Sequence, residues 1–204
     1  MLQMMKSFFS DWRRYRGELG KHDAWIRKHA ANRGWSVNPR FMLYTNLKLW
    51  LADAEAMYGR RYCPCFEPSG NPDLDRKLIC PCAFAQDEID STGWCHCTLF
   101  GRSDLSSADY KRAEDHLMAE YRGVPLAWVD GILDTRGMPV DELRGLPIPD
   151  AIHQVKRALG GHGLPLRVLV SSEVEARHLC RLAKMRGIEC SSKHTTEGYL
   201  VGIG

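Results

Sequence analysis

The sequence predicts an α+β protein of two domains, an all-α domain over residues 1–122 and a two-layer β-α-β-α-β-β sandwich over residues 123–204. Two observations support this prediction. Apolar residues recur at helical spacing through much of the first half. At residues 122–125 the character of the sequence changes, and strand-like and helix-like segments then alternate. A chain of 204 residues can form one large domain or two small ones, each with a core.

Three long helices are expected in the first domain, over residues 11–33, residues 38–58 and, from a cap at Asp104, Ser106 or Ser107, to about residue 121. Asn38 followed by Pro39 is typical of a helix start, with an N-cap and then proline at the first helical position. Gly34 and Gly59 are expected to end the first two helices. Between residues 60 and 100 we expect loops and short helical turns.

The second domain is expected to alternate strands with helices. Strands are predicted over residues 126–133, 166–170, 188–193 and 199–203, and helices over residues 149–159 and 172–186. Cys180 lies on an apolar helical face and Cys190 opens a strand, so both are expected to be small buried hydrophobic residues. A reversible disulfide between them is the alternative.

The segment from Arg61 to Arg102 holds the strongest chemical signal, because it contains six of the eight cysteines as three Cys-x-Cys pairs. These pairs are Cys63-Pro64-Cys65, Cys80-Pro81-Cys82 and Cys95-His96-Cys97. A disulfide framework, a zinc site and an iron–sulfur site compete as interpretations. Structural zinc sites usually space their ligands by two to four residues, which is wider than here. A [4Fe-4S] cluster takes four thiolates, which leaves two sulfurs over. Trp94, beside Cys95, is expected to shield such a site from water or simply to belong to the core.

Composition narrows the possible functions. The net charge of +3 is too small to argue for nucleic-acid binding, and no stretch is long enough for a transmembrane helix. The N-terminus lacks the ordered regions of a signal peptide. Eight cysteines without an export signal favour a cytoplasmic protein whose thiols serve metal or redox chemistry.

The three pairs and their flanking residues, over about residues 20–105, resemble the catalytic subunit of ferredoxin:thioredoxin reductase and related ferredoxin:disulfide reductases. The resemblance extends upstream through Gly34, Asn38-Pro39 and Tyr58-Gly59-Arg60, and downstream through Leu99-Phe100. Relative to the plant-type enzyme, the spacer between Cys65 and Cys80 is shorter and that between Cys82 and Cys95 is longer. We therefore expect the cluster chemistry to be retained and the partner-binding surface to differ.

Carried over residue by residue, the resemblance implies a [4Fe-4S] cluster with four ligands, which are Cys63, Cys80, Cys82 and Cys95. It implies that Cys65 and Cys97 form a redox-active disulfide. Cys65 would be the outer thiol that attacks the substrate, and Cys97 would lie against the cluster. His96 takes the place of the family's proton-handling histidine.

The function implied is an iron–sulfur disulfide reductase that takes single electrons from ferredoxin and reduces a protein disulfide, in thioredoxin or a similar protein. One alternative keeps this chemistry and directs it to a sulfur-carrier protein, a persulfide or another protein of sulfur metabolism through the C-terminal domain. Another is a zinc-binding interaction module without turnover.

Residues 126–204 resemble the TusA-like sulfur-carrier fold, on the stretch Leu143-Arg144-Gly145-Leu146-Pro147-Ile148-Pro149-Asp150 and the helix after it. That family has a cysteine before a proline at the start of its first helix, and here the matching positions hold Ile148 and Pro149. Because the nucleophile is missing, we expect a docking or regulatory role for this domain rather than sulfur transfer.

Overall fold

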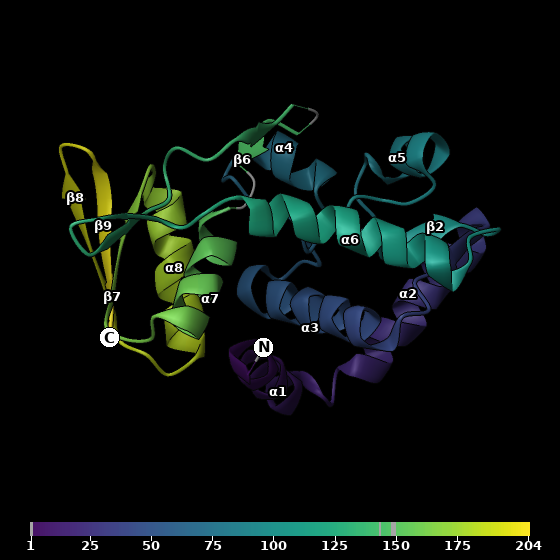
Figure 1. Ribbon diagram of the computed structural model, residues 1–204, viewed down its shortest axis with the longest axis horizontal. Helices are drawn as coiled ribbons and strands as arrows, with labels where there is room; N and C mark the ends of the chain where they lie inside the picture. Colours follow the sequence, from purple (N-terminus) through teal and green to yellow (C-terminus); the bar gives the residue numbers. More distant parts are fainter. Residues whose placement is uncertain (1, 143, 148–149) are drawn as a thin grey trace. The chain divides into compact units, whose positions relative to one another are not determined.

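The computed structural model describes residues 2–142, 144–147 and 150–204, and it shows a mixed α/β protein (Figure 1). The chain divides into two compact units, Met4–Arg122 and Gly123–Gly204. Each unit is built around its own buried side chains. Ile148 and Pro149, which match the cysteine and proline positions of the sulfur-carrier family, lie outside the described residues.

The first unit is mainly helical. Its helices are α1 (Leu2–Tyr15), α2 (Leu19–Arg33), α3 (Phe41–Tyr58), α4 (Pro72–Lys77), α5 (Ala85–Thr92) and α6 (Ser107–Gly123). Gly34 and Gly59 end α2 and α3 in the left-handed conformation, as predicted. The fully buried side chains include Ile26 of α2 and Leu47 and Leu51 of α3, so these two helices form much of the core.

The single helix expected over residues 11–33 is two helices. The chain makes a turn between α1 and α2, in which the Arg16 amide donates to the Trp12 carbonyl and the Glu18 amide donates to the Tyr15 carbonyl. Gly17 lies in this turn, and glycine costs about 1 kcal/mol in a helix relative to alanine. The helical spacing continues across the turn, which explains why the pattern predicted one element.

The predicted start of the next helix is also corrected. Helix α3 begins at Phe41, after Arg40, and not at Asn38. Asn38 is buried, its side-chain amide donates to the Thr98 carbonyl at 2.9 Å, and its side-chain oxygen accepts from the Arg40 amide. A residue that resembles a helix cap therefore joins two distant segments instead.

The first unit is not all-α, because it contains a short antiparallel ladder. Strand β1 (Trp35–Val37) pairs with β2 (Phe100–Arg102), with Ser36 opposite Gly101. The Ser36 hydroxyl reinforces the pair by donating to the Arg102 carbonyl at 2.6 Å. These three-residue strands are too short to produce a clear alternating pattern, so sequence periodicity does not reveal them.

The second unit is a five-stranded sheet with two helices. Figure 1 shows both helices, α7 (Ala151–Gly161) and α8 (Glu173–Met185), beside the sheet. The strand order is β3-β4-β7-β9-β8, in which only β4 and β7 are parallel neighbours. The strands are β3 (Ala127–Val129), β4 (Ile132–Asp134), β7 (Leu166–Val170), β8 (Cys190–Thr195) and β9 (Gly198–Ile203).

The predicted strand over residues 126–133 is a hairpin. Asp130 and Gly131 both have positive φ, 49° and 74°, which is the conformation of a two-residue hairpin turn that follows the twist of its strands. A further pair, β5 (Val140–Asp141) and β6 (Leu146–Pro147), precedes α7. The expected β-α-β-α-β-β order therefore gains strands before its first helix.

Capping residues in the sequence mark the starts of the two helices of this unit. Asp150 caps α7 by accepting from the His153 amide, and Ser172 and Glu175 form a capping box at α8.

The expectation that Cys180 and Cys190 are unbonded core residues is wrong, since they form a disulfide and are only half-buried.

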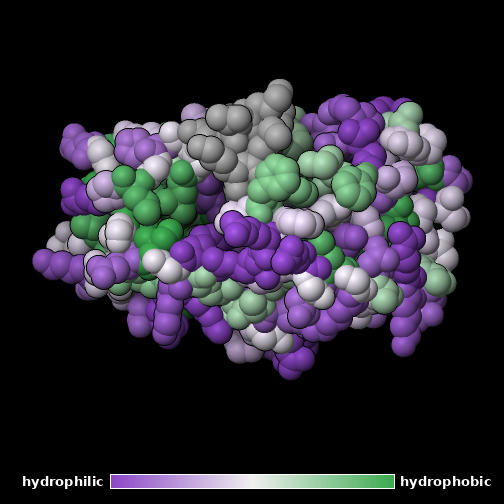
Figure 2. All heavy atoms as spheres, turned by 90° about the horizontal axis from the view of Figure 1, so that it is seen from below, coloured by the Kyte–Doolittle hydropathy of each residue, from purple (hydrophilic) through white to green (hydrophobic). Residues whose placement is uncertain are grey.

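The surface viewed in Figure 2 is mainly hydrophilic, with hydrophobic residues in several separate groups. Large exposed hydrophobic side chains occur in both units, and examples are Phe41, Met42, Trp128 and Val129. In the part of the chain that the structure describes, no helix combines the length and apolar character needed to cross a membrane.

Candidate redox site

The first two cysteine pairs are held together by backbone hydrogen bonds. The Cys63 amide donates to the Leu78 carbonyl and the Cys80 amide donates to the Arg61 carbonyl, both at 2.7 Å. These bonds flank an antiparallel bridge between Tyr62 and Ile79. The loop after α3 and the loop after α4 are thereby fixed as one short ladder, which brings both pairs to the same place.

The loop between these two pairs has its own supports. Helix α4 is capped by Asn71, whose side chain accepts from the Asp73 amide. The carboxylate of Asp75, which is buried, accepts from the amides of Ser69 and Gly70 at 2.7 and 3.0 Å. The turn predicted from the proline and glycine residues around position 70 is thus an ordered loop.

The third pair lies in a tight turn that is tied to β1 and α3. The Cys95 amide donates to the Phe100 carbonyl at 2.9 Å, and the Thr98 amide donates to the Cys95 carbonyl at 2.7 Å. Thr98 has a positive φ of 58°, an uncommon conformation for a β-branched residue. Its carbonyl accepts from Asn38, so the connection between β1 and α3 helps to hold this turn.

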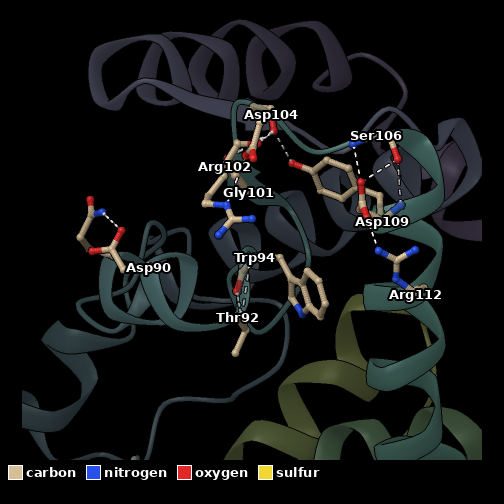
Figure 3. A network of polar contacts seen from close by, with 12 residues as sticks. Asp90, Thr92, Trp94, Gly101, Arg102, Asp104, Ser106, Asp109 and Arg112 are labelled. Carbon is tan, nitrogen blue, oxygen red and sulfur yellow. Dashed lines mark hydrogen bonds and ion pairs between the residues drawn. The ribbon is translucent and has the colours of Figure 1, made fainter.

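Figure 3 shows polar contacts of residues that precede and follow the third pair. Trp94 and Gly101 form an antiparallel bridge, and the Thr92 hydroxyl donates to the Trp94 carbonyl. Ser106 and Asp109 exchange hydrogen bonds at the start of α6. The turn with Cys95 and Cys97 is therefore fixed on both sides.

The sulfur atoms of the three pairs converge in the interior. All six cysteines are thiols and buried, with exposed fractions of 1% for Cys65 to 8% for Cys82. The four expected cluster ligands line one hollow together with neighbouring residues. Its lining consists of Cys63, Cys80, Pro81, Cys82, Ala85, Cys95, His96, Cys97 and Phe100. The hollow thus brings together residues from all three pairs.

Individual sulfurs lie within interaction distance of each other. The Sγ atoms of Cys95 and Cys97 are 3.7 Å apart. Those of Cys63, Cys65 and Cys97 all lie within 4.8 Å of one another, which is close enough to share a metal ion. The Phe100 amide also donates to the Cys95 sulfur at 3.3 Å. Hydrogen bonds of this kind stabilise negative charge on a thiolate and tune the potential of an iron–sulfur site.

Because the thiols are closely packed and buried, their pKa values shift in opposite directions. Hydrogen bonds from Cys65, Cys82 and Cys97 hold the pKa of Cys63 well below its ordinary value. The hydrogen bond to Cys63 raises the pKa of Cys82, followed by the effect of burial. Burial raises the pKa of Cys80, and the nearby Arg61 opposes this. A lowered pKa at Cys63 favours metal binding there, because a cysteine ligand must be deprotonated.

Arg61 brings a positive charge to this region and is itself held in place. Its guanidinium group donates to Glu55 at 2.8 Å and to the ring of His22, and it lies over the ring of Trp25. His22 is fully buried, and burial lowers its pKa, followed by the effect of Arg61. The neutral imidazole is therefore suited to accept the hydrogen bond from Arg61.

His96 lies between the two cysteines of the third pair and is anchored by two carboxylates. Its backbone amide donates to Glu88 at 2.8 Å, and its Nε2 atom is 3.3 Å from a carboxylate oxygen of Glu120. Its ring is 5.3 Å from that of Phe66. The imidazole beside the thiols is thus held by contacts with α5, with α6 and with the loop that contains Phe66.

Each residue that the sequence singles out can now be located. The six cysteines and His96 come together, whereas Trp94 does not line the hollow, where Phe100 contributes the aromatic surface. Cys65, expected to be the outer thiol, is 1% exposed. Sequence reasoning missed Glu88 and Glu120, because residues from separate helices that meet a histidine have no characteristic spacing.

Comparison with known proteins provides the final observation. No curated protein matches the chain. The family described as ferredoxin thioredoxin reductase catalytic beta chain matches residues 13–121, which is more than half of the 204 residues. The match contains all three cysteine pairs, and both it and the thiol cluster fit an oxidoreductase that acts on disulfides. The chain belongs to the family of ferredoxin thioredoxin reductase catalytic beta chains.

Proposed function

We propose that the protein is an iron–sulfur disulfide reductase that takes single electrons from ferredoxin and reduces a disulfide in thioredoxin or a similar protein. The observation that carries this proposal is the convergence of six buried thiols from three loops. Four of them, Cys63, Cys80, Cys82 and Cys95, would hold a [4Fe-4S] cluster. The other two, Cys65 and Cys97, would form the redox-active pair.

The residues present fit such a cluster. The four proposed ligands all line the same hollow, and each is at least 92% buried. Four thiolates from protein loops are the usual ligand set of a [4Fe-4S] cluster, and Phe100 offers an amide hydrogen bond to one of them. When bound, the cluster would supply one-electron redox chemistry next to the cysteine pair. The protein's part is to exclude water and to hold the sulfurs in position.

The cysteine pair would carry out the two-electron step. Two electrons and two protons convert the Cys65–Cys97 disulfide to thiols. The Cys65 thiolate then attacks the target disulfide and forms a mixed disulfide, and the Cys97 thiolate displaces the target as a thiol and restores the Cys65–Cys97 bond. His96 lines the hollow beside Cys97. A ring nitrogen of His96 would hold the proton that is transferred to or from the cysteine pair.

Access to Cys65 sets a condition on this step. Because the side chain is 1% exposed, a target sulfur cannot reach it without movement of the covering residues. Phe66 follows directly and is itself buried. We therefore expect docking of the target to displace the loop after Cys65.

The energetics favour reduction of the target. A plant-type ferredoxin has a potential of about −400 mV, and thioredoxin has a potential of about −270 mV. Transfer of two electrons over this difference releases about 6 kcal/mol. The net reaction therefore proceeds toward the thiol form of thioredoxin.

A second candidate function is a zinc-binding interaction module. The observation that favours it is the close group of Cys63, Cys65 and Cys97, which mixes one proposed cluster ligand with both proposed redox thiols. Three thiolates with one further ligand would complete a tetrahedral zinc site. Zinc–thiolate proteins are colourless, whereas iron–sulfur proteins are brown, so the two candidates are readily distinguished.

The test is the iron and acid-labile sulfide content of anaerobically purified protein, together with its visible spectrum. We expect four irons and four sulfides per chain. Cys65→Ser should retain them and lose reduction of thioredoxin, because only the attacking thiol is removed. A colourless protein with bound zinc would refute the reductase, and loss of colour in Cys65→Ser would refute the division into ligands and redox thiols.

A further inference from the structure

We propose that the Cys180–Cys190 disulfide of the second unit is a second redox-active site, reduced by the Cys65 and Cys97 thiols of the first. This inference rests on the proposed function for its electron source. It assigns to the second unit a redox role that does not depend on a carrier cysteine at the start of α7.

The placement of the disulfide supports thiol exchange. Cys180 lies on α8 and Cys190 opens β8, with their Cα atoms 5.2 Å apart. Both residues are half-buried, in contrast to the six buried cysteines of the first unit. Exchange requires that an attacking thiolate reach a sulfur atom along the S–S axis, so partial exposure is a requirement that this disulfide meets.

The disulfide also sits at a sheet edge. Strand β8 is the last strand in the order β3-β4-β7-β9-β8, and four of its six residues are exposed. Figure 1 shows α8 alongside these strands. The disulfide joins the outermost strand to the helix, so a thiol-bearing protein can approach it from the open edge.

The charged residues next to the two cysteines along the chain differ in sign. Arg177, Arg181 and Lys184 lie on α8 at three residues before, one after and four after Cys180, and all three are exposed. On a helix, residues three and four apart are neighbours. A nearby positive charge stabilises a thiolate. Cys190 instead follows Glu189, whose negative charge has the opposite effect.

This asymmetry indicates the direction of attack. The thiol that forms the more stable thiolate leaves more readily. The Cys65 thiolate would therefore attack the Cys190 sulfur, and Cys180 would depart as a thiolate and take up a proton. The Cys97 thiolate would then attack the Cys65 sulfur and release Cys190. In total, two electrons and two protons pass from one pair to the other, which leaves a Cys65–Cys97 disulfide and two thiols in the second unit.

The test follows the thiol state of each pair in the whole protein. Anaerobic holoprotein is reduced with reduced ferredoxin, with an oxidised thioredoxin present as an external target. Samples are quenched with acid and alkylated, and the Cys180 and Cys190 peptides are quantified by mass spectrometry. We expect both to become alkylated at least about tenfold faster in the unsubstituted protein than in Cys65→Ser.

Each outcome is informative about a different claim. If thioredoxin is reduced while Cys180–Cys190 stays oxidised, the inference is overturned and the proposed function stands. If the disulfide is reduced equally fast in Cys65→Ser, the donor assignment is overturned. If neither disulfide is reduced, both the function and the inference fail.

A second measurement tests the charge argument without the reductase. After full reduction with a phosphine, the alkylation rate of Cys180 at neutral pH should fall about threefold in Arg177→Gln, because Arg177 lies three residues before Cys180 on α8. Arg167→Gln is the matched control, since Arg167 is exposed and lies between Leu166 and Val168, which face the helices from the buried side of β7. Equal rates in both variants would overturn the assignment of Cys180 as the leaving thiol.

Discussion

The two units use cysteine in different ways. In the first unit, loops between short elements bring six thiols into the interior, where each is at least 92% buried. In the second, a regular helix and an edge strand hold two half-buried sulfurs in a disulfide. Burial protects a set of thiolates that share a cofactor, whereas exposure permits exchange with other thiols. Under the proposed function, exchange at the buried Cys65 would require movement of the covering residues, whereas the half-buried disulfide is already partly accessible.

The largest expected effect would come from removal of one proposed ligand. Cys80→Ser should lose the bound iron and its visible absorption, because a serine oxygen is a poor substitute for a thiolate at a cluster corner. Iron content and the visible spectrum measure this directly. Cys180→Ser is the matched control, since it removes a cysteine from the other unit and should retain the full iron content. Equal loss in both variants would contradict the contrast between the units.

The sequence predicts the folds of the two units to different extents. The sequence signals of the second unit are local: Ser172 with Glu175 marks the start of α8, and the strand at Leu166–Val170 has the bounds expected. Its hairpin was missed because apolar residues flank Asp130 and Gly131 on both sides and suggest a single strand, although Asp-Gly is itself a turn signal.

In the first unit the cysteine pairs indicate where the site is, but they do not indicate how it is assembled. Asn38 has the local signature of a helix cap, and its actual hydrogen bond is to Thr98, 60 residues away. Glu88 and Glu120 reach His96 from two helices. Such contacts depend on tertiary packing, and no pattern in neighbouring residues encodes them. The pairing of Cys180 with Cys190 likewise depends on the distance between α8 and β8.

Removal of the disulfide should destabilise only the second unit. The double variant Cys180→Ser/Cys190→Ser should lose about 3 kcal/mol of unfolding free energy there, because the cross-link closes a loop of sequence separation 10 and so restricts the unfolded chain. Hydrogen exchange with mass spectrometry reads the two units separately. Peptides of the first unit, and its visible spectrum, serve as the internal control. A matching loss of protection in both units would show that they do not unfold independently.

Two glycines test how tightly each unit is packed. A Cβ at Gly101 would lie 2.6 Å from Leu105 and 2.7 Å from the Tyr110 hydroxyl, beside the turn with the third cysteine pair. At Gly198, with a φ of 139°, it would lie 2.4 Å from the Val170 carbonyl oxygen. We expect each alanine variant to lose about 2 kcal/mol in its own unit. Urea unfolding followed by hydrogen exchange measures both losses.

Gly20→Ala is the control for these two variants, because a Cβ at this helical position meets nothing within 4 Å. We expect stability to be unchanged or raised by up to about 1 kcal/mol, since alanine favours the helix. A loss at Gly20 as large as at Gly101 would show that the effect arises from the substitution itself and not from the packing around the redox site.

The smallest expected effect concerns an ion pair of the second unit. Arg136 binds both carboxylate oxygens of Asp134, at 2.9 and 2.8 Å, and the side chains are 32% and 23% exposed. Hydrogen bonds from Arg136 lower the pKa of Asp134 below its ordinary value. The ion pair therefore stabilises the unit at pH values above about 4, and this stability is lost as the pH falls through the lower folded-state pKa. Asp134→Asn should cost about 1 kcal/mol at pH 7.

The pH dependence distinguishes this ion pair from a general effect of the substitution. At pH 7 the charged carboxylate is lost in Asp134→Asn, whereas the unsubstituted protein protonates the same carboxylate as the pH falls through its lowered folded-state pKa, so the difference in unfolding free energy should be smaller near pH 2 than at pH 7. Asp104→Asn is the matched control, because Asp104 pairs with Arg102 through a single contact at 3.2 Å and both side chains are more than half exposed. Solvent screens such a pair, so its removal should leave stability unchanged. If Asp134→Asn had the same cost at both pH values, the ion pair would not be the cause, and the stability of the second unit would depend on its core and its disulfide.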